Sequence, residues 1–247
     1  MRRSLLVFFL ATLALASLAA PAAFAQGVNL YWNDCGGGTG AAINRNFACD
    51  ANTGDPFTMV LSVFPPVEMP QFVGVEARID VLVNAPSLPP WWQTASGQCR
   101  AGAVSATCDP NSFGTLSCPD IWDGAPAISI SQVTSAPVSW GFIIRFAGAV
   151  PAPSPITAEE VGQELIAGVV RISRAKTVGA GACDGCLIGA CFVVSQVKLA
   201  QPAGVGDVLL SYPAANNWVQ LNGGTGNYNC YVPAMNRTWG AIKTLYR

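Results

Sequence analysis

The chain has 247 residues, of which 51% are hydrophobic and 11% are charged, and its 13 Lys and Arg nearly balance its 14 Asp and Glu. So few basic side chains cannot supply the row of phosphate contacts that nucleic-acid binding requires. The chain contains no histidine, which excludes Ser-His-Asp and Cys-His catalysis and imidazole-ligated metal or haem sites. High apolar content with low charge is typical of a folded protein rather than a disordered one.

The first 25 residues have the features of a secretory signal peptide. A short basic segment precedes an uncharged run, rich in Leu, Phe and Ala, from Leu5 to Ala20. Ala23-Phe24-Ala25 places small residues at both positions that signal peptidase reads, so cleavage is expected after Ala25. The alternative is an uncleaved membrane anchor of about 20 apolar residues, which Pro21 disfavours. The sequence therefore predicts a secreted protein, extracellular or periplasmic, with no membrane span in the mature chain 26–247.

The mature chain alternates apolar and polar residues with a period of two, which is typical of half-buried β-strands. The clearest case is the segment 71–83, where Val75, Ile79 and Val81 fall on one face and Arg78 falls on the other. Further β-branched and aromatic runs are bounded by Gly, Pro or Asn. The expected strands, about nine, are 28–32, 57–64, 71–83, 127–134, 140–146, 164–173, 191–200, 207–212 and 218–221.

Strands without crossover helices predict the all-β class, with residues 26–247 forming a single antiparallel β-sandwich or jelly roll. A helix could begin after Ala158, but the β-branched residues that follow favour a strand there. A short C-terminal helix is expected from Thr238, which can cap it, with Trp239, Ile242 and Leu245 near one face.

The stretch 85–126 lacks a strand pattern and carries the residues that most suggest a binding site, Trp91, Trp92, Trp122 and Asp123. Loops on a rigid sandwich often carry binding residues. Exposed Trp rings can stack on sugars, while Asp123 can accept hydrogen bonds from hydroxyl groups. The alternative is that the three Trp side chains plug the open end of the sandwich, since aromatic residues bury large apolar areas.

Two other patterns are candidates for a catalytic or a metal site. Asp120 and Asp123 could form the carboxyl pair, about 5 Å apart, of a retaining glycosidase. The segment from Asp50 to Asp55 faintly resembles the start of a twelve-residue calcium loop. The twelfth residue counted from Asp50 is Leu61, however, where such a loop needs a bidentate acid. An Asx turn explains the same residues. We therefore expect no enzymatic activity, no catalytic residue, no metal and no cofactor.

All nine cysteines lie in the mature chain, and an exported chain is expected to form disulfides. Three expected pairs join neighbours around common loops, and a fourth joins the last loop to the Cys183 cluster. The ninth cysteine, Cys108, is left over because the count is odd. The cluster from Cys183 to Cys191 with Cys230 could instead hold zinc through four thiolates, or act as a redox Cys-x-x-Cys. The expected pairs are Cys35–Cys49, Cys99–Cys118, Cys186–Cys191 and Cys183–Cys230. As an unpaired loop thiol, Cys108 is expected to oxidise or to link two copies of the chain as a homodimer.

Four segments of the mature chain have distinctive sequences, Val28-Asn-Leu-Tyr-Trp-Asn-Asp-Cys35, Arg45-Asn-Phe-Ala-Cys49, Ala175-Lys-Thr-Val-Gly-Ala-Gly-Ala-Cys183-Asp-Gly-Cys186 and Asn236-Arg-Thr-Trp-Gly-Ala-Ile-Lys-Thr-Leu-Tyr-Arg247. Together they resemble a group of uncharacterised exported bacterial proteins. The resemblance covers most of the mature chain and implies no catalytic residue. The strand pattern is also similar to cohesin-like and Ig-like sandwiches, a likeness of fold that implies no function by itself.

These observations lead to an expected function. The chain is expected to be a secreted, non-catalytic β-sandwich protein that acts in extracellular or cell-surface binding or structure. The alternative is a carbohydrate-binding module that uses the loop Trp residues. The expected partners are a glycan or a component of the cell envelope.

Overall fold

The computed structural model describes residues 26–125, 127–151, 154–158 and 161–223. The expected signal peptide and C-terminal helix lie outside these residues. No helix within the described part of the chain has the length and apolarity needed to cross a bilayer.

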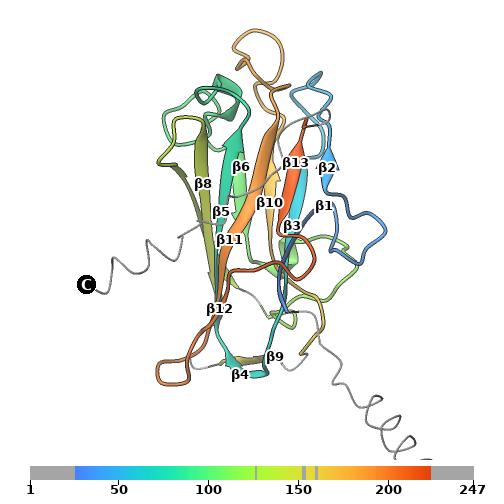
Figure 1. Ribbon diagram of the computed structural model, residues 1–247, viewed down its shortest axis with the longest axis vertical. Helices are drawn as coiled ribbons and strands as arrows, with labels where there is room; N and C mark the ends of the chain where they lie inside the picture. The colour runs from blue at the N-terminus through green and yellow to red at the C-terminus, as the bar shows by residue number, and fades with distance from the viewer. Residues whose placement is uncertain (1–25, 126, 152–153, 159–160, 224–247) are drawn as a thin grey trace, which may run out of the picture.

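Two β-sheets pack against each other as a sandwich (Figure 1). Sheet A has the strand order β1 (Gly27–Trp32), β3 (Phe57–Phe64), β10 (Leu165–Ile172) and β6 (Val104–Thr107). Sheet B has the order β2 (Asn44–Arg45), β13 (Trp218–Leu221), β11 (Ala190–Ala200), β5 (Gly74–Val83), β8 (Gly141–Ala149) and β7 (Ile128–Ser135), with β12 (Val208–Leu210) also paired to β11. A third, small sheet pairs β4 (Met69–Phe72) with β9 (Ile156–Ala158), and two short 3-10 helices, η1 (Pro90–Trp92) and η2 (Pro110–Ser112), lie in loops.

The all-β class and the antiparallel sandwich are confirmed. Neighbouring strands pair antiparallel, except for the short parallel contact of β13 with β2. In β5, Val75, Ile79 and Val81 are buried between the sheets and Arg78 lies on the opposite face, as the alternation predicts. The two layers meet through side chains such as Trp32 of β1 and Phe192 of β11, whose ring centroids are 5.8 Å apart.

The sequence missed the shorter strands. The prediction that 85–126 contains no strand is wrong, because β6 pairs there with β10. The stretch 36–55, which also lacks a strand pattern, contains the two-residue β2. A four-residue strand shows its alternation in only two apolar residues, here Val104 and Ala106, which is too little to stand out from a loop.

The disulfides differ from all four expected pairs. The bridges are Cys35–Cys118, Cys49–Cys186 and Cys99–Cys183, which are 83, 137 and 84 residues apart in sequence. Cys191 is also disulfide-bonded, while Cys230 lies outside the described residues. Proximity along the chain misled the prediction, because a sandwich brings together loops that are far apart in sequence. The bridged cysteines also leave no role for zinc-binding or redox thiols at Cys183 and Cys186.

Candidate binding site

The three loop Trp side chains are fully buried, each with 0% of its surface exposed. The Trp91 indole N–H donates to the Thr177 hydroxyl at 3.2 Å, and that of Trp92 donates to the Ile188 carbonyl at 3.1 Å. Their ring faces are therefore not accessible to a sugar, and a stacking platform made of Trp91, Trp92 and Trp122 is corrected to a plug of the sandwich. The sequence pattern of Trp and Pro in this loop could not tell burial from exposure.

Arg100, which the sequence did not single out, anchors this loop. Arg100 is 2% exposed, and its Cζ lies 3.7 Å from the centre of the Trp91 ring. It donates hydrogen bonds to the carbonyls of Ala175 at 2.8 Å and Trp91 at 3.1 Å, and also to that of Ser173. Burial lowers the pKa of Arg100 to about 10, so the group stays charged at neutral pH. Its role is to connect the Trp91 loop to the segment that follows β10.

The aspartates of this region serve turns. Asp123 is exposed, with a positive φ of 49°. Asp120 Oδ1 accepts the backbone N–H groups of Trp122 at 2.9 Å and Gly124 at 3.2 Å, which is the geometry of an Asx turn. Within the described ranges, no cluster of three or more Cys, Asp or Glu side chains could hold a metal ion.

Cys108 is the free cysteine among the described residues, but it is buried in the core rather than exposed on a loop. Burial raises the pKa of its thiol to about 12, although the Ser129 hydroxyl partly opposes this. A Cβ built on Gly148 would lie 2.3 Å from the Cys108 Cβ, so the thiol fills the space that this glycine leaves. The expected homodimer through Cys108 is therefore corrected: the thiol is not accessible to a second chain.

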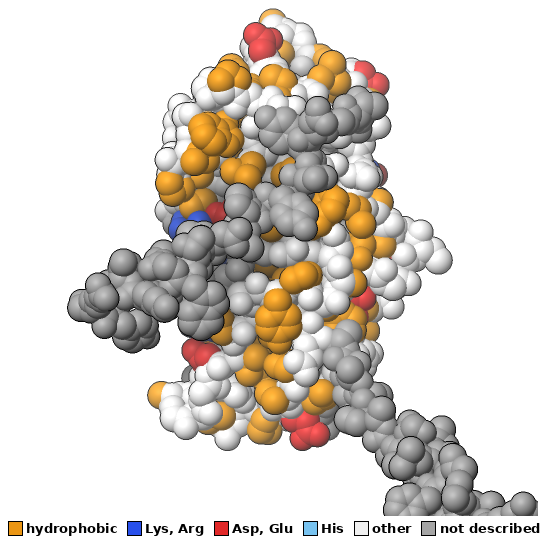
Figure 2. Space-filling model, viewed as in Figure 1, with side chains coloured by type: hydrophobic (Ala, Val, Ile, Leu, Met, Phe, Trp, Pro, Cys, Tyr) orange, Lys and Arg blue, Asp and Glu red, His pale blue; other side chains and the backbone are white. Residues whose placement is uncertain are grey.

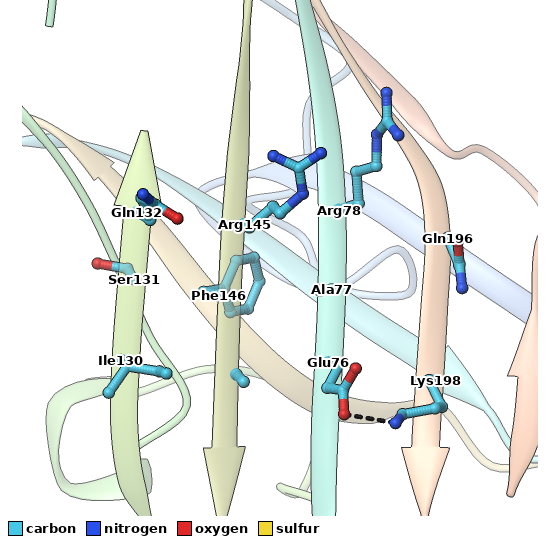
Figure 3. A pocket seen from close by; sticks show the side chains of 11 residues that line it. Glu76, Ala77, Arg78, Ile130, Ser131, Gln132, Arg145, Phe146, Gln196 and Lys198 are labelled. Atoms are coloured by element: carbon cyan, nitrogen blue, oxygen red, sulfur yellow. Dashed lines mark ion pairs between the residues drawn. The ribbon is translucent and has the colours of Figure 1, made fainter. Parts of the chain in front are cut away.

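A shallow pocket of about 400 Å³ lies on the outer face of sheet B, the face turned away from sheet A. Figure 2 shows that hydrophobic side chains gather on the side of the molecule where β5, β8 and β11 lie in front, and that charged ones are sparse there. Side chains from four strands line the pocket (Figure 3). One row of cross-strand neighbours, here called the arginine row, consists of Gln132, Arg145, Arg78 and Gln196. The next row consists of Ile130, Ala147, Glu76 and Lys198.

The charges of the pocket are unevenly paired. Arg78 donates two hydrogen bonds to Asp80 Oδ1, at 2.7 and 3.0 Å. Lys198 forms an ion pair with Glu76, and the hydrogen bond between the two side chains raises the pKa of Lys198. Arg145 donates to the Thr134 hydroxyl at 2.9 Å and makes no ion pair with any residue that the structure describes. Arg145 also lies directly opposite Arg78, and like charges in this position destabilise a sheet.

Exposed apolar side chains border the pocket at the edge strand β7. Ile128 and Ile130 are 76% and 70% exposed. On the same face, Leu209 of β12 lies opposite Lys198 and is 56% exposed. Exposed isoleucines clustered beside a charged pocket are typical of a surface that binds another molecule. The alternation of β5 predicted that Arg78 faces outward, but the alignment of Arg78 with Arg145 depends on a register that the sequence did not reveal.

Comparisons with known proteins add little to this picture. No protein-family model matches the chain, and no curated protein matches it. Among solved structures, the chain is similar to a type III cohesin module from the cellulosomal ScaE cell-surface anchoring scaffoldin of Ruminococcus flavefaciens, at 10% sequence identity and a TM-score of 0.27. The match covers 79% of this chain and 87% of that one. At these values the likeness carries no functional argument.

Proposed function

We propose that the chain is an exported, non-catalytic binding protein and that the outer face of sheet B holds a carboxylate-bearing segment of an extracellular protein partner. The observation that carries this proposal is the pair Arg78 and Arg145, aligned across β5 and β8 at a shallow pocket. Of the two, Arg145 makes no ion pair within the described part of the chain.

A guanidinium presents a planar fork of N–H donors that matches the two oxygens of a carboxylate. A carboxylate bound between Arg78 and Arg145 would relieve the repulsion between them, so part of the cost of placing them opposite each other is recovered on binding. Gln132 and Gln196 end the same row and offer amide groups that can hydrogen-bond a peptide backbone.

The borders of the pocket favour a protein partner over a glycan. Sugar recognition commonly uses an exposed aromatic face, whereas the aromatic residue that lines this pocket, Phe146, is only 3% exposed. The exposed Ile128 and Ile130 instead suit apolar side chains that neighbour an acidic residue in a peptide.

Export is part of the same proposal. It rests on the expected signal peptide, residues 1–25, and gains support from the bridged cysteines, because such disulfides persist in oxidising compartments.

The test is peptide selection on the mature protein from a random phage-displayed library. We expect the selected peptides to carry Asp or Glu beside Ile, Leu or Val. Arg145→Gln should weaken their binding about tenfold or more, as expected for loss of a charged hydrogen bond. The control, Arg174→Gln, removes the same charge from a side chain that contacts Phe57 and Asp55 rather than the pocket, and should change binding less than twofold.

Three outcomes would contradict the proposal. The first is selection of peptides that carry no acidic residue, and the second is an equal loss of binding in both variants. The third is binding of polygalacturonate, a carboxylated polysaccharide, that depends on Arg145 while no peptide binds. That result would assign the same pocket to an acidic glycan.

A further inference from the structure

The two main sheets end in four edge strands, β1 and β6 in sheet A and β2 and β7 in sheet B. Backbone N–H groups of β1 donate to the carbonyls of Tyr212, Asn216 and Ala42. The edge N–H of Ala106 in β6 donates to a serine hydroxyl of β7, and β2 is only two residues long. The eight-residue β7 is therefore the long edge strand that remains.

The pairing of β7 with β8 leaves alternate backbone groups of β7 pointing away from the sheet. The Ala136 N–H donates to the Gly141 carbonyl, and hydrogen-bonded pairs alternate with non-bonded ones along an antiparallel ladder. By the register of the strands, Thr134 and every second residue before it bond to β8. The N–H and C=O groups that point to the open edge, without a partner in the described part of the chain, belong to Ser129, Ser131, Val133 and Ser135.

The open edge lacks the features that usually keep an edge strand from pairing with another chain. The strand has the sequence Ile128-Ser-Ile-Ser-Gln-Val-Thr-Ser135, which contains no charged residue and no proline. Its register with β8 is continuous, without a bulge. Natural sheets commonly protect their edges with Lys, Pro or a bulge, so this edge is suited to accept a further strand.

We infer that the partner segment binds in an extended conformation and adds to sheet B as a further strand along β7. The inference rests on the proposed function, because it states how the carboxylate-bearing segment of that function is held. In strand addition, main-chain hydrogen bonds supply affinity and the side chains on one face supply specificity. Here the bonds would be made by the outward N–H and C=O groups of β7.

The outer face beside β7 favours an acidic segment of defined spacing. Arg145 of β8 donates to the Thr134 hydroxyl of β7 at 2.9 Å, so its guanidinium lies over the edge strand. Ile130 and Ile128 are four and six residues from Thr134 and are both exposed. Because strand side chains alternate with a period of two, the segment should carry Asp or Glu opposite Thr134 and apolar residues four and six positions away.

A second copy of the chain is a poorer occupant of this edge. Two copies could pair through β7, but the strand contains no Asp or Glu. Such a dimer would bring no carboxylate from β7 to Arg145 in either copy. A separate acidic segment can satisfy the open backbone groups and the guanidinium together.

Amide hydrogen exchange of the mature protein, followed residue by residue by NMR, tests whether the edge is open. We expect the N–H groups of Ser131 and Val133 to exchange about tenfold or more faster than those of Ile130 and Gln132, which bond to β8. Equal protection of the two sets would show that the edge is already covered. That result would overturn strand addition without touching the pocket at Arg145.

A proline on β7 tests strand addition with the peptides selected from the phage-displayed library. Ser131→Pro removes an outward N–H and no bond to β8, and proline is tolerated at such edge positions. We expect it to weaken peptide binding about tenfold or more, as loss of several main-chain bonds requires. The control, Ser96→Pro, makes the same change in an exposed turn closed by Gln98 N–H and Ala95 C=O, where proline is favourable. It should change binding less than twofold.

N-methylation of the peptide gives a readout that leaves the protein unchanged. Each amide of the tightest-binding selected peptide is methylated in turn. In an added strand only alternate residues face β7 with their N–H groups, so binding should be lost at every second position and kept at the positions between. Equal effects at all positions would contradict an extended strand.

The outcomes separate the inference from the proposed function. If acidic peptides bind and depend on Arg145, but Ser131→Pro and alternate N-methylation leave their binding unchanged, the proposed function stands and strand addition is overturned. If no acidic peptide is selected, the proposed function fails and the inference fails with it. A dimer in sedimentation velocity that Ser131→Pro dissociates would assign the edge to a second copy and also overturn the inference.

Discussion

At the scale of single residues, Arg100 shows how a charge can be tolerated in the interior. Its guanidinium gives up hydration but donates to three backbone carbonyls and stacks on Trp91. A buried charge is costly unless it is hydrogen-bonded in this way. Two of the three carbonyls, those of Ser173 and Ala175, belong to the segment after β10, so Arg100 joins parts of the chain that are about 75 residues apart.

Arg100→Ala is expected to lower the free energy of unfolding by about 2–4 kcal/mol, because it leaves buried carbonyls without donors. Arg100→Lys should recover little of this loss, since an ammonium lacks the planar fork and stacks poorly. Urea denaturation of the three proteins measures the effect. If Arg100→Ala is as stable as the unmodified protein, the three hydrogen bonds do not hold the loop.

Cys108 is expected to be chemically inert in the folded protein, because its raised pKa leaves almost no thiolate near neutral pH. Iodoacetamide should modify it only after denaturation, and non-reducing electrophoresis should show no dimer that Cys108→Ser removes.

The raised pKa of Cys108 also makes the folded state favour the protonated thiol. Its stabilising contribution is therefore complete below about pH 9 and is lost toward pH 12. A steeper loss of stability in Cys108→Ala than in the unmodified protein over this range would contradict the assignment.

At the scale of elements, alternation along a strand decides what each substitution meets. Ile79 of β5 is fully buried, with Val194 and Ile144 as its cross-strand neighbours. Arg78, the preceding residue, forms a partly exposed ion pair with Asp80 on the outer face, and ion pairs near the surface contribute little to stability. Neighbouring positions of one strand are therefore expected to respond very differently.

Ile79→Asp should lower the free energy of unfolding by more than about 3 kcal/mol, because it buries an unpaired carboxylate. Arg78→Ala should change it by no more than about 0.5–1 kcal/mol. Thermal and urea denaturation of both variants compare the two faces. Equal losses would mean that the register of β5 in sheet B is wrong.

Gly148 of β8 packs tightly against side chains of the loop after β6 and of the Trp122 loop. A Cβ there would lie 2.3 Å from the Cys108 Cβ and 3.1 Å from the Trp122 ring. Gly148→Ala is therefore expected to cost about 1–3 kcal/mol through overpacking. In the matched substitution Gly40→Ala, the added Cβ would lie 3.6 Å from its nearest neighbour, the Asp34 Cβ. This substitution should leave the free energy of unfolding nearly unchanged. A calorimetric melting temperature that falls equally for both would remove close packing as the cause.

The edges of the two sheets also meet. The backbone N–H of Cys108, just beyond the end of the edge strand β6, donates to the Ser129 hydroxyl of β7 at 2.9 Å. The N–H of Ala106 similarly donates to the Ser131 hydroxyl at 3.5 Å. Serine side chains of one sheet thus satisfy backbone donors at the edge of the other, which protects that edge against pairing with a second chain.

At the scale of the whole molecule, the disulfides connect loops that belong to different parts of the chain. Cys49–Cys186 closes a segment of 137 residues and Cys99–Cys183 one of 84. Bridges across such long segments restrict the unfolded chain strongly, so they contribute to the stability of a fold rich in loops.

The double variant Cys49→Ser with Cys186→Ser is expected to lose about 2–5 kcal/mol of stability, since the chain-entropy model predicts about 5 kcal/mol for a segment of this length. Denaturation under non-reducing conditions measures the loss against Cys108→Ser, which breaks no bridge. A loss no greater than that of Cys108→Ser would show that native contacts alone hold these loops together.

The sequence by itself determined the all-β class, most of the longer strands and the inward face of β5. These follow from a period-two alternation, which is a local property of the backbone and is visible in one strand at a time. It did not determine the short strand β6, because two apolar residues do not make a period. The signal peptide and the C-terminal helix stay predictions.

Only the tertiary structure decided the disulfide pairs, the burial of Trp91, Trp92 and Cys108, and the alignment of Arg78 with Arg145. Each depends on which distant segments the sandwich brings together. A cysteine can pair with any other that the fold places within reach, and a Trp in a loop is exposed or buried according to what packs over it. Cross-strand register likewise arises from packing between strands, so charges that are 67 positions apart become neighbours only when the sheet forms.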